Sequence, residues 1–90
     1  MNSGETGKYH LRIISPEKLL VDVEVTEVQV PGLDGYLGIW PGHRPLNACL
    51  GNGEVIYRTL DNREGKVEIK RGIIKVENDK IIILTGMSND

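Results

Sequence analysis

Residues 31–46 read PGLDGYLGIWPGHRPL, and this stretch decides the fold class. It holds three of the four prolines and four of the eleven glycines in the 90-residue chain. A helix cannot run through Pro41 and Pro45, because proline lacks a backbone N–H and its ring clashes with the preceding helical turn. We therefore expect tight turns around one short strand, residues 36–40. The residues expected to shape these turns and close backbone contacts are Gly32, Gly38, Pro41, Gly42 and Pro45.

Strand patterns recur on both sides of this stretch, with turn residues between them. Val21, Val23 and Val25 alternate on one face, and Val28 continues the pattern one residue out of register, which predicts a β-bulge near residues 26–27. Such a bulge lets one strand pass from one sheet of a sandwich to the other. We expect strands at residues 9–14, 18–30 (one long strand or a pair), 36–40, 46–50, 54–60, 66–70, 72–77 and 80–84.

Glycine and asparagine mark two more turns. Gly51-Asn52-Gly53 predicts a tight hairpin, because these residues tolerate positive φ. Asn78-Asp79 predicts a second hairpin with a type I′ turn. With residues 1–8 expected as a flexible leader and 87–90 as a flexible tail, one domain covers residues 9–86. We expect it to be all-β, a β-sandwich of about ten short strands.

The composition agrees with this fold class and excludes several functions. Val, Ile and Thr make up 22 of the 90 residues, whereas Ala48 is the only alanine, which argues against helices. A net charge of −2 with scattered basic residues argues against nucleic-acid binding. The longest apolar run, Ile81–Leu84, is far shorter than the roughly 20 residues that span a bilayer. We expect a soluble chain that reaches a membrane only through a partner.

The reactive residues form no pattern that predicts catalysis or metal binding. His10 and His43 stand 33 positions apart without a nearby ligand, unlike the histidines of a zinc site. No nucleophile elbow accompanies His43. The glycines of residues 31–46 match neither the dinucleotide-binding pattern nor the phosphate-binding P-loop. We therefore expect no catalytic residue, no metal and no cofactor, and an outward-facing His10.

Two other residues bear on function. The one cysteine, Cys49, cannot form a disulfide within the chain, which indicates a reducing compartment, and we expect it to be a buried small apolar residue. Trp40 suits either the core or a contact surface, where tryptophan is enriched. A small β domain with a rigid aromatic loop is typical of a docking module.

The range Val30–Leu46 resembles the signature of the epsilon subunit of rotary F-type ATP synthases, which reads P-G-x-x-G-x-L-G-I-x-P-G-H-x-P-L. The resemblance extends over residues 9–85 and departs from the family at Tyr36, where an acidic residue is common, and at Arg71, where a second glycine is usual. Shorter matches lie on both sides: ISPE at residues 14–17, LGNGEVIY at 50–57 and GIIKVEN at 72–78.

This resemblance implies a non-catalytic rotor subunit of the central stalk. In that family the β-sandwich couples the gamma shaft to the membrane c-ring during ATP synthesis driven by protons or sodium ions. Many members continue into a C-terminal helical hairpin that can inhibit ATP hydrolysis and in some members binds ATP. Because this chain ends at Asp90, we expect no C-terminal helical domain. The implied location is peripheral, at the cytoplasmic face of the bacterial inner membrane, with no homo-oligomer required.

The resemblance also assigns contact residues, one set for each stalk partner. Two alternatives stay open beside it: a stand-alone β-sandwich adaptor that binds another protein, and, behind it, a small hydrolase built around His43. The implied gamma-subunit interface comprises Ser15, His43 and Ala48, and the implied c-ring interface comprises Asp34, Gly35 and Tyr36.

Overall fold

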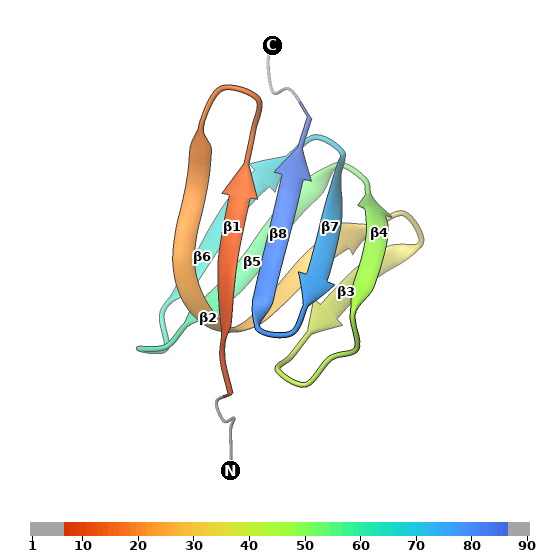
Figure 1. The fold of residues 1–90 in the computed structure, drawn as a ribbon. Helices are drawn as coiled ribbons and strands as arrows, with labels where there is room; N and C mark the ends of the chain where they lie inside the picture. Colours follow the sequence, from red (N-terminus) through yellow and green to blue (C-terminus); the bar gives the residue numbers. More distant parts are fainter. Residues whose placement is uncertain (1–6, 87–90) are drawn as a thin grey trace.

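Two packed β-sheets form the fold, which the computed structural model describes for residues 7–86 (Figure 1). The predicted β-sandwich is confirmed, and the described residues contain no helix. Residues 7–86 contain eight strands rather than about ten, and residues 19–32 form one long bent strand rather than a pair. The strands are β1 (Tyr9–Ile14), β2 (Leu19–Gly32), β3 (Gly35–Ile39), β4 (Leu46–Leu50), β5 (Gly53–Thr59), β6 (Glu64–Ile69), β7 (Gly72–Glu77) and β8 (Lys80–Thr85).

Strand β2 belongs to both layers. The front sheet has the order β4, β7, β8, β1 and the first part of β2, and the back sheet has the order β6, β5, the second part of β2 and β3 (Figure 1). Neighbouring strands are antiparallel except β1 and β8, which run parallel. The register of β2 against β5 shifts between Val25 and Glu27, which confirms the bulge expected near residues 26–27. This shift is where the strand passes from one sheet to the other.

The core lies between the two sheets, and every strand contributes to it. The buried residues occupy alternate positions along their strands. Examples that are 0% exposed are Leu11, Ile13, Ile74, Ile81 and Ile83. Full burial of such a side chain stabilises the fold by about 1.5–3 kcal/mol. Successive side chains of a strand point to opposite faces, so each strand also presents a second row of residues on an outer face.

Two connections differ from the sequence-based expectation. The Gly51–Gly53 segment is not a hairpin, because β4 pairs with β7 in the front sheet while β5 pairs with β2 and β6 in the back sheet. The chain crosses between the layers there. The hairpin at residues 78–79 is confirmed, but φ is positive at Asn78 (46°) and not at Asp79, so the turn is not type I′. The Asp79 carbonyl instead accepts the N–H of His10 at 2.8 Å, which ties the turn to β1.

The terminal segments fall mostly outside the described residues. The expected leader, residues 1–8, is described only from residue 7, and the expected tail, residues 87–90, lies outside. Within the described part, Lys8 forms an ion pair with Glu24 at 3.4 Å.

Candidate functional site

The β2–β3 hairpin places a short exposed turn at one corner of the sandwich. The two strands pair in register, and Leu33 and Asp34 form the turn. Gly35 has a φ of 126°, and a Cβ on Gly32 would lie 2.8 Å from the Gly35 carbonyl oxygen. Glycine is therefore required at both positions. The turn leaves Leu33, Asp34 and Gly35 exposed.

Tyr36 is half exposed but held in place. Its side chain is 55% exposed, and its hydroxyl accepts the backbone N–H of Glu54 at 3.1 Å. Gly53 leaves room for this contact, because a Cβ there would lie 2.9 Å from Pro31 Cβ and 3.1 Å from the Tyr36 hydroxyl. A ring that is already ordered loses less side-chain entropy when a partner covers it.

Trp40 begins the loop from β3 to β4, residues 40–45, and its indole ring lies against Gly38 of β3. A Cβ on Gly38 would stand 2.6 Å from two carbons of the indole ring, so the missing side chain of Gly38 makes the seat for the ring. The indole Nε1–H donates a hydrogen bond to Glu27 Oε1 at 2.8 Å. Trp40 nevertheless stays 53% exposed. Of the two locations that the sequence left open, the core and the surface, the structure therefore places this residue at the surface.

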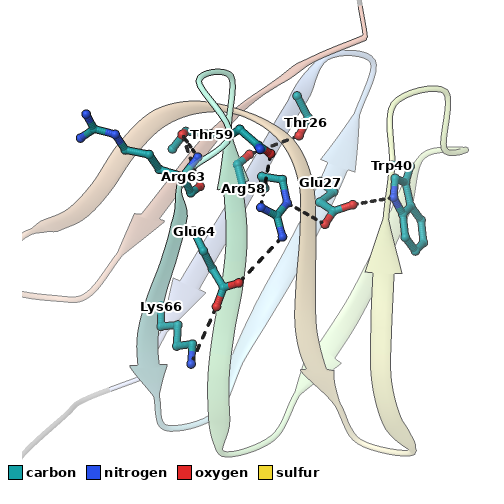
Figure 2. A network of polar contacts seen from close by, with 9 residues as sticks. Thr26, Glu27, Trp40, Arg58, Thr59, Arg63, Glu64 and Lys66 are labelled. Carbon is teal, nitrogen blue, oxygen red and sulfur yellow. Dashed lines mark hydrogen bonds and ion pairs between the residues drawn. The ribbon is translucent and has the colours of Figure 1, made fainter.

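A charged network on the outer face of the back sheet holds Glu27 in position. Figure 2 shows Glu27 between Trp40 and Arg58, with Glu64 and Lys66 continuing the chain of contacts. Arg58 Nε lies 3.5 Å from Glu27 Oε2, and Arg58 Nη2 lies 3.9 Å from Glu64 Oε1. Lys66 Nζ lies 3.8 Å from Glu64 Oε2. The sequence analysis missed Glu27 and Arg58. These residues are far from Trp40 in the sequence, and they meet it only because β2, β3 and β5 lie side by side.

The backbone of Trp40 contacts the opposite layer. Its carbonyl oxygen accepts hydrogen bonds from the hydroxyl of Tyr9, on β1, and from the backbone N–H of His43, both at 3.1 Å. Burial raises the pKa of Tyr9, and a hydrogen bond with the His43 backbone opposes this shift. Residue 40 therefore joins the front sheet through its carbonyl and the back sheet through its indole. The 40–45 loop also contains Gly42, whose φ is 90°.

We expect Glu27→Ala to release the indole of Trp40, the only tryptophan of the chain. Because the Nε1–H loses its acceptor, acrylamide quenching of the tryptophan fluorescence should increase. The free energy of unfolding should fall by only about 1 kcal/mol, since these groups remain partly exposed to solvent. The control is Glu24→Ala, which removes the glutamate paired with Lys8 on the other sheet and should leave quenching unchanged. Equal quenching in Glu27→Ala and the unchanged protein would contradict this prediction.

The three residues expected to face a gamma subunit lie in three different places. Ser15 is buried in the turn after β1, where its Oγ donates to the Lys18 carbonyl at 3.2 Å. His43 is exposed in the 40–45 loop, at the opposite end of the sandwich (Figure 1). Ala48 is half buried in the middle of β4 and packs against the core. The geometry does not bring these three residues together.

One pocket does gather residues from both expected interfaces. It has a volume of about 300 Å³ between the β2–β3 hairpin and β4. Ala48 thus lies beside the residues expected to face a c-ring, rather than beside Ser15 or His43. The pocket is lined by Gly32, Leu33, Asp34, Gly35, Tyr36, Leu37, Ala48 and Cys49.

Two residues outside these sets have a clear outcome. The expectation that Cys49 is buried is wrong: its thiol is exposed, because Leu46, Ala48 and Leu50 take the inward positions of β4. The outward orientation expected for His10 is confirmed, since its ring contacts Asp22 on the outer face of the front sheet.

Between residues 7 and 86, no three His, Cys, Asp or Glu side chains come together as a metal site would require. Nor does that part of the chain hold a helix suited to crossing a bilayer.

Comparisons with known proteins agree on one family. A family model for the β-sandwich domain of the ATP synthase delta/epsilon chain matches residues 8–87. The ATP synthase epsilon chain of Lawsonia intracellularis is 45% identical over 76 residues, which cover 84% of this chain and 56% of the relative. The epsilon chain of Chlorobium limicola is 42% identical over 77 residues, covering 86% of this chain and 88% of the relative. This chain thus spans about half of the first relative and most of the second.

Solved structures share the fold at low sequence identity. A chain from the mitochondrial ATP synthase of Euglena gracilis, in a structure of OSCP, F1 and c-ring, superposes with a TM-score of 0.84 at 16% identity. The match covers 92% of this chain and 53% of that one. A chain from the central stalk and c-ring of the Tetrahymena thermophila mitochondrial ATP synthase gives a TM-score of 0.74 at 13% identity, with coverage of 94% and 67%.

Proposed function

This chain belongs to the ATP synthase delta/epsilon β-sandwich family, and we therefore propose that it is a non-catalytic rotor subunit of the central stalk. It would couple the gamma shaft to the membrane c-ring during ATP synthesis driven by protons or sodium ions. The observation that carries the proposal is the likeness to the Chlorobium limicola epsilon chain, which extends over 88% of that relative. The location would be peripheral, at the cytoplasmic face of the bacterial inner membrane.

The mechanical properties of the fold support a coupling role. An adaptor between two rotating parts has to resist deformation, and two sheets packed at interior density do so well. Here β2 runs through both layers, and Gly32 of β2 also pairs with Leu50 of β4 at a second corner. Trp40 adds a further link, because its indole is bound to one sheet and its carbonyl to the other. Relative sliding of the sheets would strain β2 and break the Gly32–Leu50 pairing and the contacts of Trp40.

We assign the two ends of the β3 region to different partners. The β2–β3 turn exposes Asp34, Gly35 and Tyr36 beside Leu33, which is 70% exposed, and the Asp34 carboxylate suits the polar loops of a c-ring. His43 lies in the 40–45 loop on the other end of β3, which suits the shaft. Ser15 and Ala48 are also assigned to the shaft, in places apart from His43, and the buried Ser15 would act by shaping the β1–β2 turn. Ala48 is half buried, so it would contribute mainly by shaping the edge of β4.

Co-purification tests the function directly. A tagged chain is expressed in its native host, membranes are solubilised in detergent, and bound proteins are identified by mass spectrometry against a tag-only control. We expect the gamma, α, β and c subunits. Recovery of an unrelated partner without synthase subunits would reject the stalk role while leaving the fold intact.

Separate variants test the two assigned contacts. Tyr36→Ala should weaken binding to a purified c-ring by about 2 kcal/mol, or roughly 30-fold, if the ring is an interface anchor. Tyr36→Phe retains the ring and should bind nearly as the unchanged chain does. His43→Glu should weaken binding to isolated gamma and spare the c-ring, so each variant is the control for the other. Equal loss of both partners in either variant would contradict the assignment, as would no loss at all.

A further inference from the structure

The outer face of the front sheet carries one continuous line of apolar side chains, which we call the apolar row. Direct pairing connects its members across five strands, in the order β2, β1, β8, β7 and β4. The residues next to them along the strands, such as Ile13, Ile74 and Ile83, are buried in the core, so the row points outward. Its members are Leu19 (49% exposed), Ile14 (half buried), Leu84 (49% exposed), Ile73 (51% exposed) and Cys49 (exposed).

The shape of the apolar row matches an α-helix. Five strands spaced about 4.8 Å apart make a row about 19 Å long. A helix advances about 5.4 Å per turn, so its apolar stripe would place one side chain near each strand over three to four turns. The neighbouring row is largely polar, with Asp22, Arg12, Lys75 and Asn47 on four of its five strands. A second sheet would have to cover several rows, so a surface one row wide favours a helix.

Three basic and two acidic side chains lie beside the apolar row, which gives this border a small positive excess. Arg12 and Lys75 lie in the neighbouring row, and Arg71 lines a pocket of about 490 Å³ together with Cys49. Asp22 and Glu77 offset two of these three charges, at 3.7 Å from Arg12 and 3.6 Å from Lys75, and leave the charge of Arg71. The chain as a whole carries a net charge of −2, so this basic border departs from its average. It complements a helix whose apolar stripe is flanked by Asp or Glu.

We propose that the apolar row is a docking surface for an amphipathic helix of a partner protein, with acidic residues beside its apolar stripe. This inference rests on the proposed function and deepens it. Ile14 adjoins Ser15, and Cys49 adjoins Ala48, so the row runs between two of the residues assigned to the shaft. On β4 the outward contact is then made by Cys49 rather than by Ala48.

Binding of synthetic helices tests the chemistry of the partner. Three 18-residue peptides are compared: a leucine stripe flanked by Glu, the same stripe flanked by Lys, and the Glu peptide with its leucines scrambled. NMR titration of the labelled chain should show shifts centred on residues 14, 19, 73 and 84, and the Glu peptide should bind at least tenfold more tightly than the other two. Equal affinities, or shifts centred elsewhere, would overturn the proposal.

Substitutions identify the row as the binding surface. Leu84→Asp should weaken binding of the Glu peptide at least tenfold. The matched control is Leu60→Asp, because Leu60 is also 49% exposed but lies after β5, and its affinity should not change. Ile73→Thr serves as a second variant, since threonine suits a strand and the fold is retained. Thermal unfolding checks that each variant is folded. Equal weakening by Leu60→Asp would overturn the proposal.

The native thiol tests the same surface in the assembled complex. Cys49 is the only cysteine, so its rate of maleimide labelling reports directly on the end of the row. We expect labelling at least tenfold slower in the purified synthase than in the isolated chain. If the synthase assembles but Cys49 reacts as fast as in the free chain, the row proposal fails and the function stands. If no synthase subunits co-purify, the proposed function fails whatever the peptides do. Protection by self-association of the isolated chain, seen in light scattering, would instead assign the row to a second copy.

Discussion

Ile83→Ala is expected to lower the free energy of unfolding by about 2–5 kcal/mol, the range for truncating a buried isoleucine. Ile83 is 0% exposed and pairs with Ile13 on one side and Ile74 on the other, so three buried isoleucines meet at the centre of the front sheet. Rigid sheets cannot close over the cavity. Since small domains are stable by about 5–15 kcal/mol in total, this loss would be a large share.

Urea denaturation measures this loss, and the neighbouring residue provides the control. Leu84→Ala removes a side chain of similar size that is 49% exposed on the outer face, so it should cost less than about 1 kcal/mol. In thermal unfolding, Ile83→Ala should lower the midpoint by at least about 8 °C. If both variants lost a similar amount of unfolding free energy, the core would not lie between the sheets.

Gly72→Ala is the second substitution with a large expected effect, about 1–3 kcal/mol or more. A Cβ at this position would lie 2.5 Å from the Leu84 carbonyl oxygen and 3.2 Å from Thr85 Cα. Both are backbone atoms of β8, so relief requires moving that strand. Gly72 also pairs with Leu50 on its other side, so it cannot shift away without disturbing β4.

A second glycine separates this clash from a general effect of adding a methyl group. Gly51→Ala would bring a Cβ to 3.7 Å from Leu33 Cδ2, which is ordinary contact, and it should change the free energy of unfolding by less than about 0.5 kcal/mol. Chemical denaturation of both variants makes the comparison. If Gly72→Ala proved as stable as Gly51→Ala, β7 and β8 would not approach each other as closely as the structure indicates.

Arg71 shows how one residue can be informative in sequence and explained only in the fold. The family usually has a glycine at this position, and the structure gives Arg71 a φ of 58°. That left-handed conformation is the one glycine adopts without penalty. The family preference therefore reflects backbone geometry at the turn before β7, and Arg71 retains the geometry while adding a charge beside Cys49.

The strands themselves could be predicted because their signal is local. Alternation of apolar and polar residues gave the bounds of β1, β4 and β7 correctly, and the shift of valines in β2 located its bulge. Residues 31–46 likewise predicted turns and a short strand, because proline and glycine restrict the backbone at their own positions. Family membership was also available from the sequence, since the motif needs no knowledge of pairing.

Pairing between distant strands could be decided only by the tertiary structure. Gly51–Gly53 has the residues of a hairpin turn, yet it joins two sheets, because the partner of β4 is β7, more than twenty residues away. The same applies to Cys49: it is an apolar residue in a strand, and only the position of the core determines that it faces outward.

Some residues of the candidate site are close in the sequence, and others are brought together only by the fold. Asp34, Gly35 and Tyr36 are neighbours in sequence and remain neighbours in the fold. The seat of Trp40 needs Glu27 and Arg58 from other strands, and the apolar row takes one residue from each of five strands. The sequence by itself determined where strands and turns form, because each depends on residues close together in the chain. Which faces and side chains meet depends on how the strands order and register, and that order results from burying one common core.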